Sequence, residues 1–334
     1  MIRVLRFFKS PISLVTLVVF VGSLLVAVPR YESAAQSTVA DCGLCITAPA
    51  GTSTVLSGST SLTVTGGGVG VESTGAPAMS LAGSSKIVAS GPVRTRGTIT
   101  KASSATITPA PVPSVVGSVV VDPYPTRAVV VAQPTSAAVT DFVKTATAVF
   151  PVRVDGAYRD VTLTSVGTFV FPTGHRFRDV TVGGSAFVTL RPGTYRNLNL
   201  TGASTVTFDP GTYVVSGVLM VASSFPMSGM GVQLVFPCGS VTGVVRACNT
   251  GEMGGRLLVT GNAKLALNGT NSSGSVRYTA NNNADLIVEG SGKLLLPGSG
   301  IDAPNGLLKA SGLTLITVGG RVITRSVSLI EGGV

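Results

Sequence analysis

The chain has 334 residues, of which only 11% are charged, so it carries few of the charges that cover exposed helix faces, and its 42 Gly residues favour a β-rich fold. The hydrophobic content of 44% supplies enough apolar material for a core, which argues against disorder outside linkers. The net charge of +10 is spread without dense Lys/Arg runs, which excludes a typical nucleic-acid-binding protein.

Residues 1–30 have the pattern of a membrane-targeting segment. Three basic residues precede an uncharged stretch from Ser10 to Pro29, and Arg30 follows it. A run of this length can span a bilayer as a transmembrane helix, so we expect a membrane anchor with a cytoplasmic N-terminus and an extracytoplasmic remainder. The alternative is a signal peptide cleaved within residues 34–37, which would make the protein secreted.

Four cysteines lie in two close pairs, and outside the cytoplasm such pairs form disulfides. We expect the local bridges Cys42–Cys45 and Cys238–Cys248, although four cysteines allow three pairings. A redox motif at the first pair would need a βαβ context that the sequence does not show. A zinc site would need both pairs together, with His175 as the only histidine. No metal and no cofactor is therefore predicted.

Residues 31–108 predict a first β-solenoid segment, because Gly/Ser-rich strand–turn units recur there, such as GSTSLTVTGGG from Gly58 and GSSKIVASG from Gly83. Residues 109–150 contain six prolines and are predicted to be a linker or a cap. Within them, residues 136–149 are expected to form a short helix that covers the open end of the next segment.

Residues 151–334 are predicted to be the main solenoid, because a unit of 18 or 19 residues recurs within them. Each unit contains two runs of alternating apolar and polar residues, broken and closed by turn residues, which predicts strand, turn, strand, turn. One unit cannot bury its apolar face alone, whereas stacked units can. The sequence therefore predicts an all-β parallel β-helix with roughly 18 residues per coil in its central part; a β-sandwich is the alternative.

Stacked units would place equivalent apolar residues in three interior columns. The columns are Val161, Val180 and Leu198; Leu163, Val182 and Leu200; and Phe171, Leu190 and Phe208. The aromatic residues that open the units are Tyr158, Phe177, Tyr195 and Tyr213. We expect them to pack as a ladder at a coil corner; a sugar-stacking stripe is the alternative.

Three arginines, Arg159, Arg178 and Arg196, occupy the same place in successive units. Stacking would put them about 4.8 Å apart, where they could bind an anionic glycan or another anionic polymer. Pairing of each arginine with a neighbouring aspartate, such as Asp160 or Asp179, is the simpler expectation.

No catalytic site is predicted. Polysaccharide-cleaving solenoids need paired carboxylates, or carboxylates with a metal and a base. The 14 acidic residues are scattered, and the single histidine stands in a turn without an evident acidic partner. We therefore expect that the protein is not an enzyme.

Several stretches carry a family resemblance: the N-terminal membrane segment, Asp-Cys-Gly-Leu-Cys from Asp41, Val-Asp-Pro near Asp122, Pro-Gly-Thr-Tyr-Val-Val from Pro210, and Gly-Asn-Ala-Lys-Leu-Ala-Leu from Gly261. Together they resemble the Flp/Tad pilus-assembly TadE/TadG-like envelope proteins of bacteria. The coil length is also similar to that of bactofilins, which are polymer-forming β-helical scaffolds. The resemblance implies an envelope-anchored β-helix without known catalytic residues.

The function expected from these features is that of a structural or assembly protein of the cell envelope. Its solenoid would associate with further copies of itself or contact pilus or cell-wall components. A carbohydrate-binding or adhesive surface module is the first alternative, and a polysaccharide-acting enzyme is the second. Both glycan-related alternatives depend on the arginine column and the aromatic residues.

Overall fold

The computed structural model describes residues 42–113, 142–144, 157–164, 166–239, 245–269 and 275–330. The described residues form strands, turns and bends and no helix, so none of them forms a helix that could cross a membrane. The predicted membrane segment, residues 1–30, lies outside the described residues, as does most of the predicted linker.

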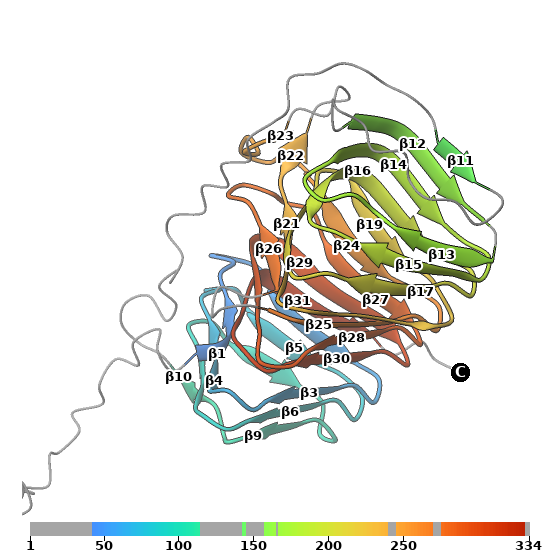
Figure 1. Cartoon of the computed structure of the whole chain (residues 1–334). Helices are drawn as coiled ribbons and strands as arrows, with labels where there is room; N and C mark the ends of the chain where they lie inside the picture. Colours follow the sequence, from blue (N-terminus) through green and yellow to red (C-terminus); the bar gives the residue numbers. More distant parts are fainter. Residues whose placement is uncertain are drawn as a thin grey trace, which may run out of the picture. The chain divides into compact units, whose positions relative to one another are not determined.

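The strands form a parallel β-solenoid whose coils have a long side and a short side (Figure 1). The long side is one 19-stranded sheet to which each coil contributes one long strand or two shorter ones. Its strands are β1 (Cys42–Ile46), β2 (Thr54–Ser57), β4 (Gly68–Val71), β5 (Met79–Leu81), β7 (Val93–Thr95), β8 (Ile99–Lys101), β10 (Val112–Pro113), β11 (Phe142–Lys144), β12 (Ala157–Leu163), β14 (Arg176–Val182), β16 (Gly193–Leu200), β18 (Gly211–Val215), β19 (Val218–Val221), β21 (Val232–Phe236), β24 (Arg256–Val259), β26 (Val276–Tyr278), β27 (Leu286–Gly290), β29 (Ile301–Gly312) and β31 (Val322–Ile330).

The short side consists of two separate sheets. The seven-stranded one contains β13 (Gly167–Val170), β15 (Ala186–Leu190), β17 (Thr205–Phe208), β20 (Pro226–Met230), β25 (Lys264–Asn268), β28 (Lys293–Leu296) and β30 (Leu315–Val318). The three-stranded one contains β3 (Ser61–Val64), β6 (Lys86–Ala89) and β9 (Thr106–Thr108). One antiparallel hairpin, β22 (Cys238–Gly239) with β23 (Val245–Arg246), stands apart from the solenoid sheets.

The predicted parallel β-helix is confirmed, with about 10 turns spaced about 22 residues apart in the described chain. Coils pair strand on strand in parallel, which rules out the antiparallel sandwich. The central coils keep the 18-residue period, since Phe177 lies opposite Tyr195. Elsewhere the coil is longer, as where Thr54 lies opposite Met79, 25 residues later.

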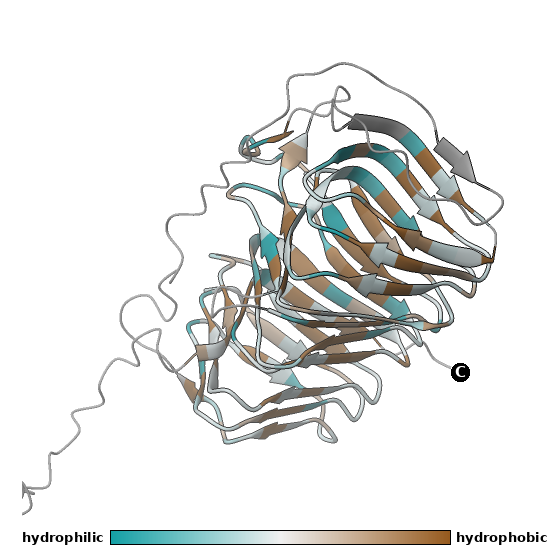
Figure 2. Cartoon of the chain, viewed as in Figure 1, coloured by the Kyte–Doolittle hydropathy of each residue, from teal (hydrophilic) through white to brown (hydrophobic). Residues whose placement is uncertain are grey.

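The interior consists of the columns that the repeat predicted. Val161 pairs with Val180 and Val180 with Leu198, and the columns through Val182 and Leu190 are aligned in the same way. All nine of these side chains are at most 1% exposed. Figure 2 shows apolar residues alternating with polar ones along the strands, so the inward-facing half of each strand fills the core.

The order of the coils in the stack differs from their order in the chain. Strands β1 and β2, the first described in the chain, pair with β31, the last: Leu44 lies opposite Val322, and Thr54 opposite Val327. Figure 1 shows the blue N-terminal strands continuing from the red C-terminal ones. The two solenoid segments expected at 31–108 and 151–334 therefore share one long-side sheet.

The helix expected within residues 136–149 is wrong for residues 142–144. These residues form β11, in which Phe142 lies opposite Val161 of β12. The free edge of β12 offers N–H and C=O groups, and a segment that pairs with this edge can bond its backbone groups there instead of within a helix. The other residues of the expected helix lie outside the described part.

Candidate functional site

The arginine column is a ladder of ion pairs. Arg178 on β14 donates from Nε to Asp160 Oδ1 at 2.8 Å, and its Nη2 donates to the second carboxylate oxygen. Arg196 on β16 makes the same two-point contact with Asp179, with 3.0 Å between Nε and Oδ1. The side chain of Arg159 lies outside the described residues. Arg178 and Arg196 are thus each neutralised by an aspartate one coil earlier.

A neutral residue takes the place of the next carboxylate. Asn197 donates from Nδ2 to Asp179 Oδ1 at 2.8 Å, and its Oδ1 accepts a hydrogen bond from the backbone N–H of Val218 at 2.9 Å. The ladder is partly exposed, and pairs at such positions stabilise a fold by about 0–1 kcal/mol each. Its main contribution is therefore to align successive coils.

The aromatic residues stack inside the coil. The ring centroids of Phe177 and Tyr195 are 5.1 Å apart with an interplanar angle of 13°, and those of Tyr195 and Tyr213 are 6.3 Å apart with an angle of 18°. All three are at most 3% exposed, so their ring faces are closed to a sugar. The side chain of Tyr158, the fourth member of the predicted ladder, lies outside the described residues.

Two of these rings keep their hydroxyl groups bonded to backbone at the corner. Tyr195 Oη donates to the carbonyl of Arg191 at 2.8 Å, and Tyr213 Oη lies 2.7 Å from the carbonyl of Leu190 and 2.8 Å from that of Asp209. Burial raises the pKa of both tyrosines well above the ordinary value, so both hydroxyls stay protonated and act as donors. The ladder is thus a structural device.

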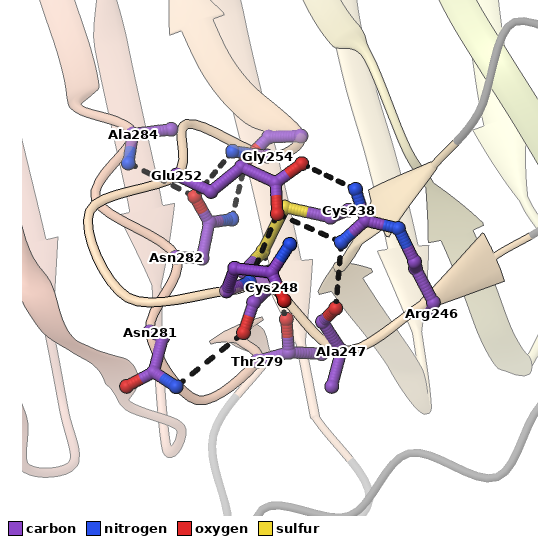
Figure 3. The surroundings of a disulfide bond; sticks show 12 residues. Cys238, Arg246, Ala247, Cys248, Glu252, Gly254, Thr279, Asn281, Asn282 and Ala284 are labelled. Atoms are coloured by element: carbon purple, nitrogen blue, oxygen red, sulfur yellow. Dashed lines mark hydrogen bonds and ion pairs between the residues drawn. A yellow bond between two sulfur atoms is a disulfide. The ribbon is translucent and has the colours of Figure 1, made fainter.

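Both expected cysteine pairs are joined in the structure. The Cys42–Cys45 bridge lies in β1, where both residues are buried against Ile323 of β31. The Cys238–Cys248 bridge closes a loop that is inserted into the long side between β21 and β24 (Figure 3).

Asn282, which the sequence analysis did not identify, ties this loop to the solenoid. It is fully buried; its Oδ1 accepts from the N–H groups of Gly254 and Ala284, and its Nδ2 donates to the carbonyls of Phe236 and Gly255. The only signal for it in the sequence is the Asn run at 281–283, a composition typical of turns. A fully bonded buried amide fixes the loop with no capacity left for a ligand.

The loop also carries an exposed ion pair, seen in Figure 3. Arg246 donates to both carboxylate oxygens of Glu252, at 2.5 and 2.7 Å, and the N–H of Asn249 donates to the same group at 2.9 Å. The hydrogen bond from Arg246, together with that from Asn249, lowers the pKa of Glu252 to about 2.

His175 is half-buried in the turn between β13 and β14, with its Nδ1 2.8 Å from the carbonyl oxygen of Thr173. Among the described residues, no three His, Cys, Asp or Glu side chains are grouped so that they could hold a metal ion.

The short side of the solenoid is interrupted between β30 and β3. On the long side, β31 lies between β29 and the pair β1 and β2. Within the described ranges, β30 pairs only with β28, and β3 pairs only with β6. A cavity of about 430 Å³ lies between the two open edges. We call this cavity the strand gap.

The walls of the strand gap are interior residues left partly uncovered. Ile316 and Val318 of β30 and Leu62 and Val64 of β3 are half-buried and pack against the core. Their counterparts one coil away are buried: Leu294, Leu296 and Ile87 are each 0% exposed, and Ala89 is 8% exposed. The difference indicates that one layer of the short side is missing from the described residues.

A second open edge lies along β8 and β9, next to β7, which β10 covers. In the part of the chain that the structure describes, β8 pairs only with β5, and β9 only with β6. Ile99 and Ile107 point toward the core but are half-buried, whereas their partners Met79 and Ile87 are 0% exposed. The apolar interior is therefore incompletely covered at this end.

Comparison of the chain with protein-family models, with curated proteins and with solved structures gave no match.

Proposed function

We propose that this protein is a non-enzymatic structural or assembly protein of the cell envelope, and that its solenoid associates with further copies through the edge formed by β8 and β9. The observation that supports this is the pair of half-buried residues, Ile99 and Ile107, on strands with an open edge. Within the described residues, β8 and β9 each have one unpaired side, whose N–H and C=O groups are a template for another strand. Stacking a second solenoid there would cover both these backbone groups and the apolar residues.

The envelope location is supported by the cationic and apolar pattern of residues 1–30 and by the resemblance to TadE/TadG-like proteins. The two disulfides are in keeping with an oxidising compartment. The ion pairs of Arg178 and Arg196 and the burial of the aromatic ladder weigh against glycan binding at those residues. Self-association is therefore the reading that the geometry supports best.

The test is the size of the purified full chain in mild detergent, measured by light scattering and by negative-stain electron microscopy over a range of concentrations. We expect ordered oligomers, and we expect Ile107→Lys to shift them to monomers, because a charge pointing inward at an edge blocks pairing. The matched control is Thr63→Lys, at an exposed position of β3. A chain that is monomeric throughout, or oligomers that Ile107→Lys leaves unchanged, would contradict the proposal.

A further inference from the structure

We propose that the outer face of the short side rests on an anionic lipid bilayer, through apolar and cationic side chains that run in a line along the seven-stranded sheet. The six strands of this sheet from β15 to β30 each present one outward side chain at the same register position. These side chains, which we call the ridge, are Phe187, Thr205, Pro226, Lys264, Lys293 and Leu315. The inference takes only the envelope location from the proposed function and does not depend on self-association along β8 and β9.

The ridge is continuous because the parallel register keeps equivalent residues in line. At one end Phe187 lies opposite Thr205, and at the other end Lys293 lies opposite Leu315. In five of the six strands the next residue along the chain is at most 3% exposed, so the ridge residues point away from the core. Neighbouring strands about 4.8 Å apart give the ridge a length of about 24 Å along the solenoid.

Exposed apolar side chains are concentrated on this side of the solenoid. Among the described residues, ten large apolar side chains are largely exposed, and seven of them lie on or directly before the strands of this sheet. Phe187 of the ridge is 56% exposed, and Leu313, in the turn that leads to Leu315, is 69% exposed. Phe225 is exposed in the same way directly before β20. The ridge and the turns beside it therefore offer apolar side chains to a partner.

The two lysines in the middle of the ridge have no carboxylate partner. Lys264 and Lys293 lie opposite each other on adjacent strands, where like charges repel. The seven strands contain no Asp or Glu, and among the described residues neither lysine forms an ion pair. On the long side, by contrast, Arg178 and Arg196 are neutralised by aspartates. An anionic surface over the ridge would offset the repulsion between the lysines.

The combination of apolar and cationic side chains favours a lipid surface over other partners. At a bilayer interface, apolar side chains enter the boundary between headgroups and acyl chains, while anionic headgroups attract lysines just outside it. The core of a protein–protein interface is depleted of lysine, and a second copy that docked through the same face would bring lysines against lysines. A soluble anionic polymer would leave Phe187 and Leu315 uncovered.

Contact along the whole ridge would fix the orientation of the solenoid. Because the ridge runs along the stack of coils, the solenoid axis would lie parallel to the bilayer. The open edge along β8 and β9, at one end of the described stack, would then point along the membrane surface. Self-association at that edge would build a row of solenoids on the membrane.

The test uses tryptophan as a probe of contact with lipid, because the chain contains no tryptophan of its own. Phe187→Trp and Leu313→Trp place the probe near the two ends of the ridge. The matched control is Met253→Trp, since Met253 is also exposed, at 64%, but lies in the loop between β21 and β24. Each full-length variant is reconstituted into vesicles of phosphatidylcholine and phosphatidylglycerol with brominated acyl chains, and its fluorescence is compared with that in unbrominated vesicles.

Bromine quenches tryptophan only at close range. We expect the fluorescence of both ridge variants to fall roughly 2-fold or more, because side chains of an interfacial face reach the acyl boundary, and that of Met253→Trp to stay nearly unchanged. Circular dichroism checks folding, and two ridge positions keep the test decisive if one variant fails to fold. Absence of quenching at the ridge, or equal quenching of the control, would overturn the proposal. Shielding that depends on chain concentration and not on bromine would overturn it as well, and would assign the ridge to contact between copies.

The role of the lysines is tested in the Phe187→Trp background over a series of salt concentrations. Lys264→Gln/Lys293→Gln should weaken docking of the ridge by up to roughly 30-fold, which corresponds to about 1 kcal/mol for each lysine near an anionic surface. The matched control is Lys309→Gln/Arg325→Gln, which removes the same charge from strands of the long side. Salt should release the first double variant at a lower concentration than the second. Equal salt dependence of the two would overturn the proposal of an anionic partner.

Alkaline extraction of the same vesicles tests the predicted membrane anchor separately. A chain that resists extraction while its ridge variants are not quenched keeps the proposed membrane location and rules out the docked ridge. A chain that alkali removes, but whose ridge variants were quenched, contradicts the anchor and supports the ridge.

Discussion

The central coils, residues 157–208, and the N-terminal coils, residues 42–113, belong to one long-side sheet but are held in register by different means. The central coils repeat every 18 or 19 residues and carry the stacked rings and the Arg–Asp ladder. The N-terminal coils have unequal lengths: Thr54 lies opposite Met79, 25 residues later, and Met79 opposite Ile99, 20 residues later. The strands of a solenoid can therefore stay in register while the turns between them differ in length.

In the N-terminal coils, several glycines bring the backbones of neighbouring coils into close contact. A Cβ on Gly68 would lie 2.2 Å from the carbonyl oxygen of Pro92, and one on Gly75 would lie 2.4 Å from that of Gly51. The central coils contain such contacts too, since a Cβ on Gly193 would lie 2.7 Å from the carbonyl oxygen of His175, but a Cβ on Gly183 would meet only ordinary contacts, the nearest at 3.4 Å. Side-chain ladders leave a repeat that is visible in the sequence, whereas backbone contacts leave only scattered glycines.

The largest expected effect is at the ladder of the central coils. Tyr195→Ala should lower the free energy of unfolding by about 3–5 kcal/mol, because it removes a fully buried ring that stacks on two others. Tyr195→Phe keeps the ring and loses only the hydrogen bond to Arg191, so it should cost about 0.5–1.5 kcal/mol. Denaturant unfolding followed by circular dichroism measures both. Equal losses for the two variants would show that the stack itself contributes little.

The next effect contrasts a closely packed glycine of the N-terminal coils with an open glycine of the central coils. Gly68→Ala should destabilise the fold by about 1–3 kcal/mol or more, because the added methyl overlaps the backbone of Pro92. Gly183→Ala, in the central coils, is the matched control and should change stability by less than about 1 kcal/mol in either direction. Thermal unfolding of the two variants side by side decides the matter. If Gly68→Ala is tolerated as well as Gly183→Ala, close backbone contact does not set the N-terminal stacking.

The smallest effect concerns the ion pair of Arg246 and Glu252, which lies outside both regions, on the loop of Figure 3. It tests how much an exposed ion pair contributes to stability compared with the stacked rings and the close glycine contacts. The carboxyl of Glu252 should titrate at about pH 2 in the wild type, as followed by NMR, and Arg246→Gln should move its pKa up toward the ordinary 4.5.

Because the pKa of Glu252 is lower in the folded state, the pair stabilises the fold fully above about pH 4.5, and this contribution is lost as the pH falls toward 2. The stability difference between wild type and Arg246→Gln should therefore shrink over that range. Titration of the wild-type carboxyl near pH 4.5 would show that the pair does not persist in solution.

Single residues show which parts of the site were predictable. The alignment of Phe177 with Tyr195 and the pairing of Arg196 with Asp179 both follow from one period, since equivalent residues of identical coils must stack. Asn282 was not predictable, because its four bonds go to backbone groups that only the folded loop brings together. The strand gap was not predictable either, since it is defined by strands far apart in the chain.

The sequence by itself determined the parallel β-helix, the interior columns and the ladder positions, because alternation within a strand and recurrence between coils are recorded in residue type. Only the tertiary structure decided that β1 and β2 stack on β31, that the short side is interrupted, and that residues 142–144 join a sheet. The physical reason is that neighbouring strands are joined by backbone hydrogen bonds, which every residue except proline offers alike. Residue type can specify a coil, but the choice of its neighbour depends on which open edges the folded chain brings together.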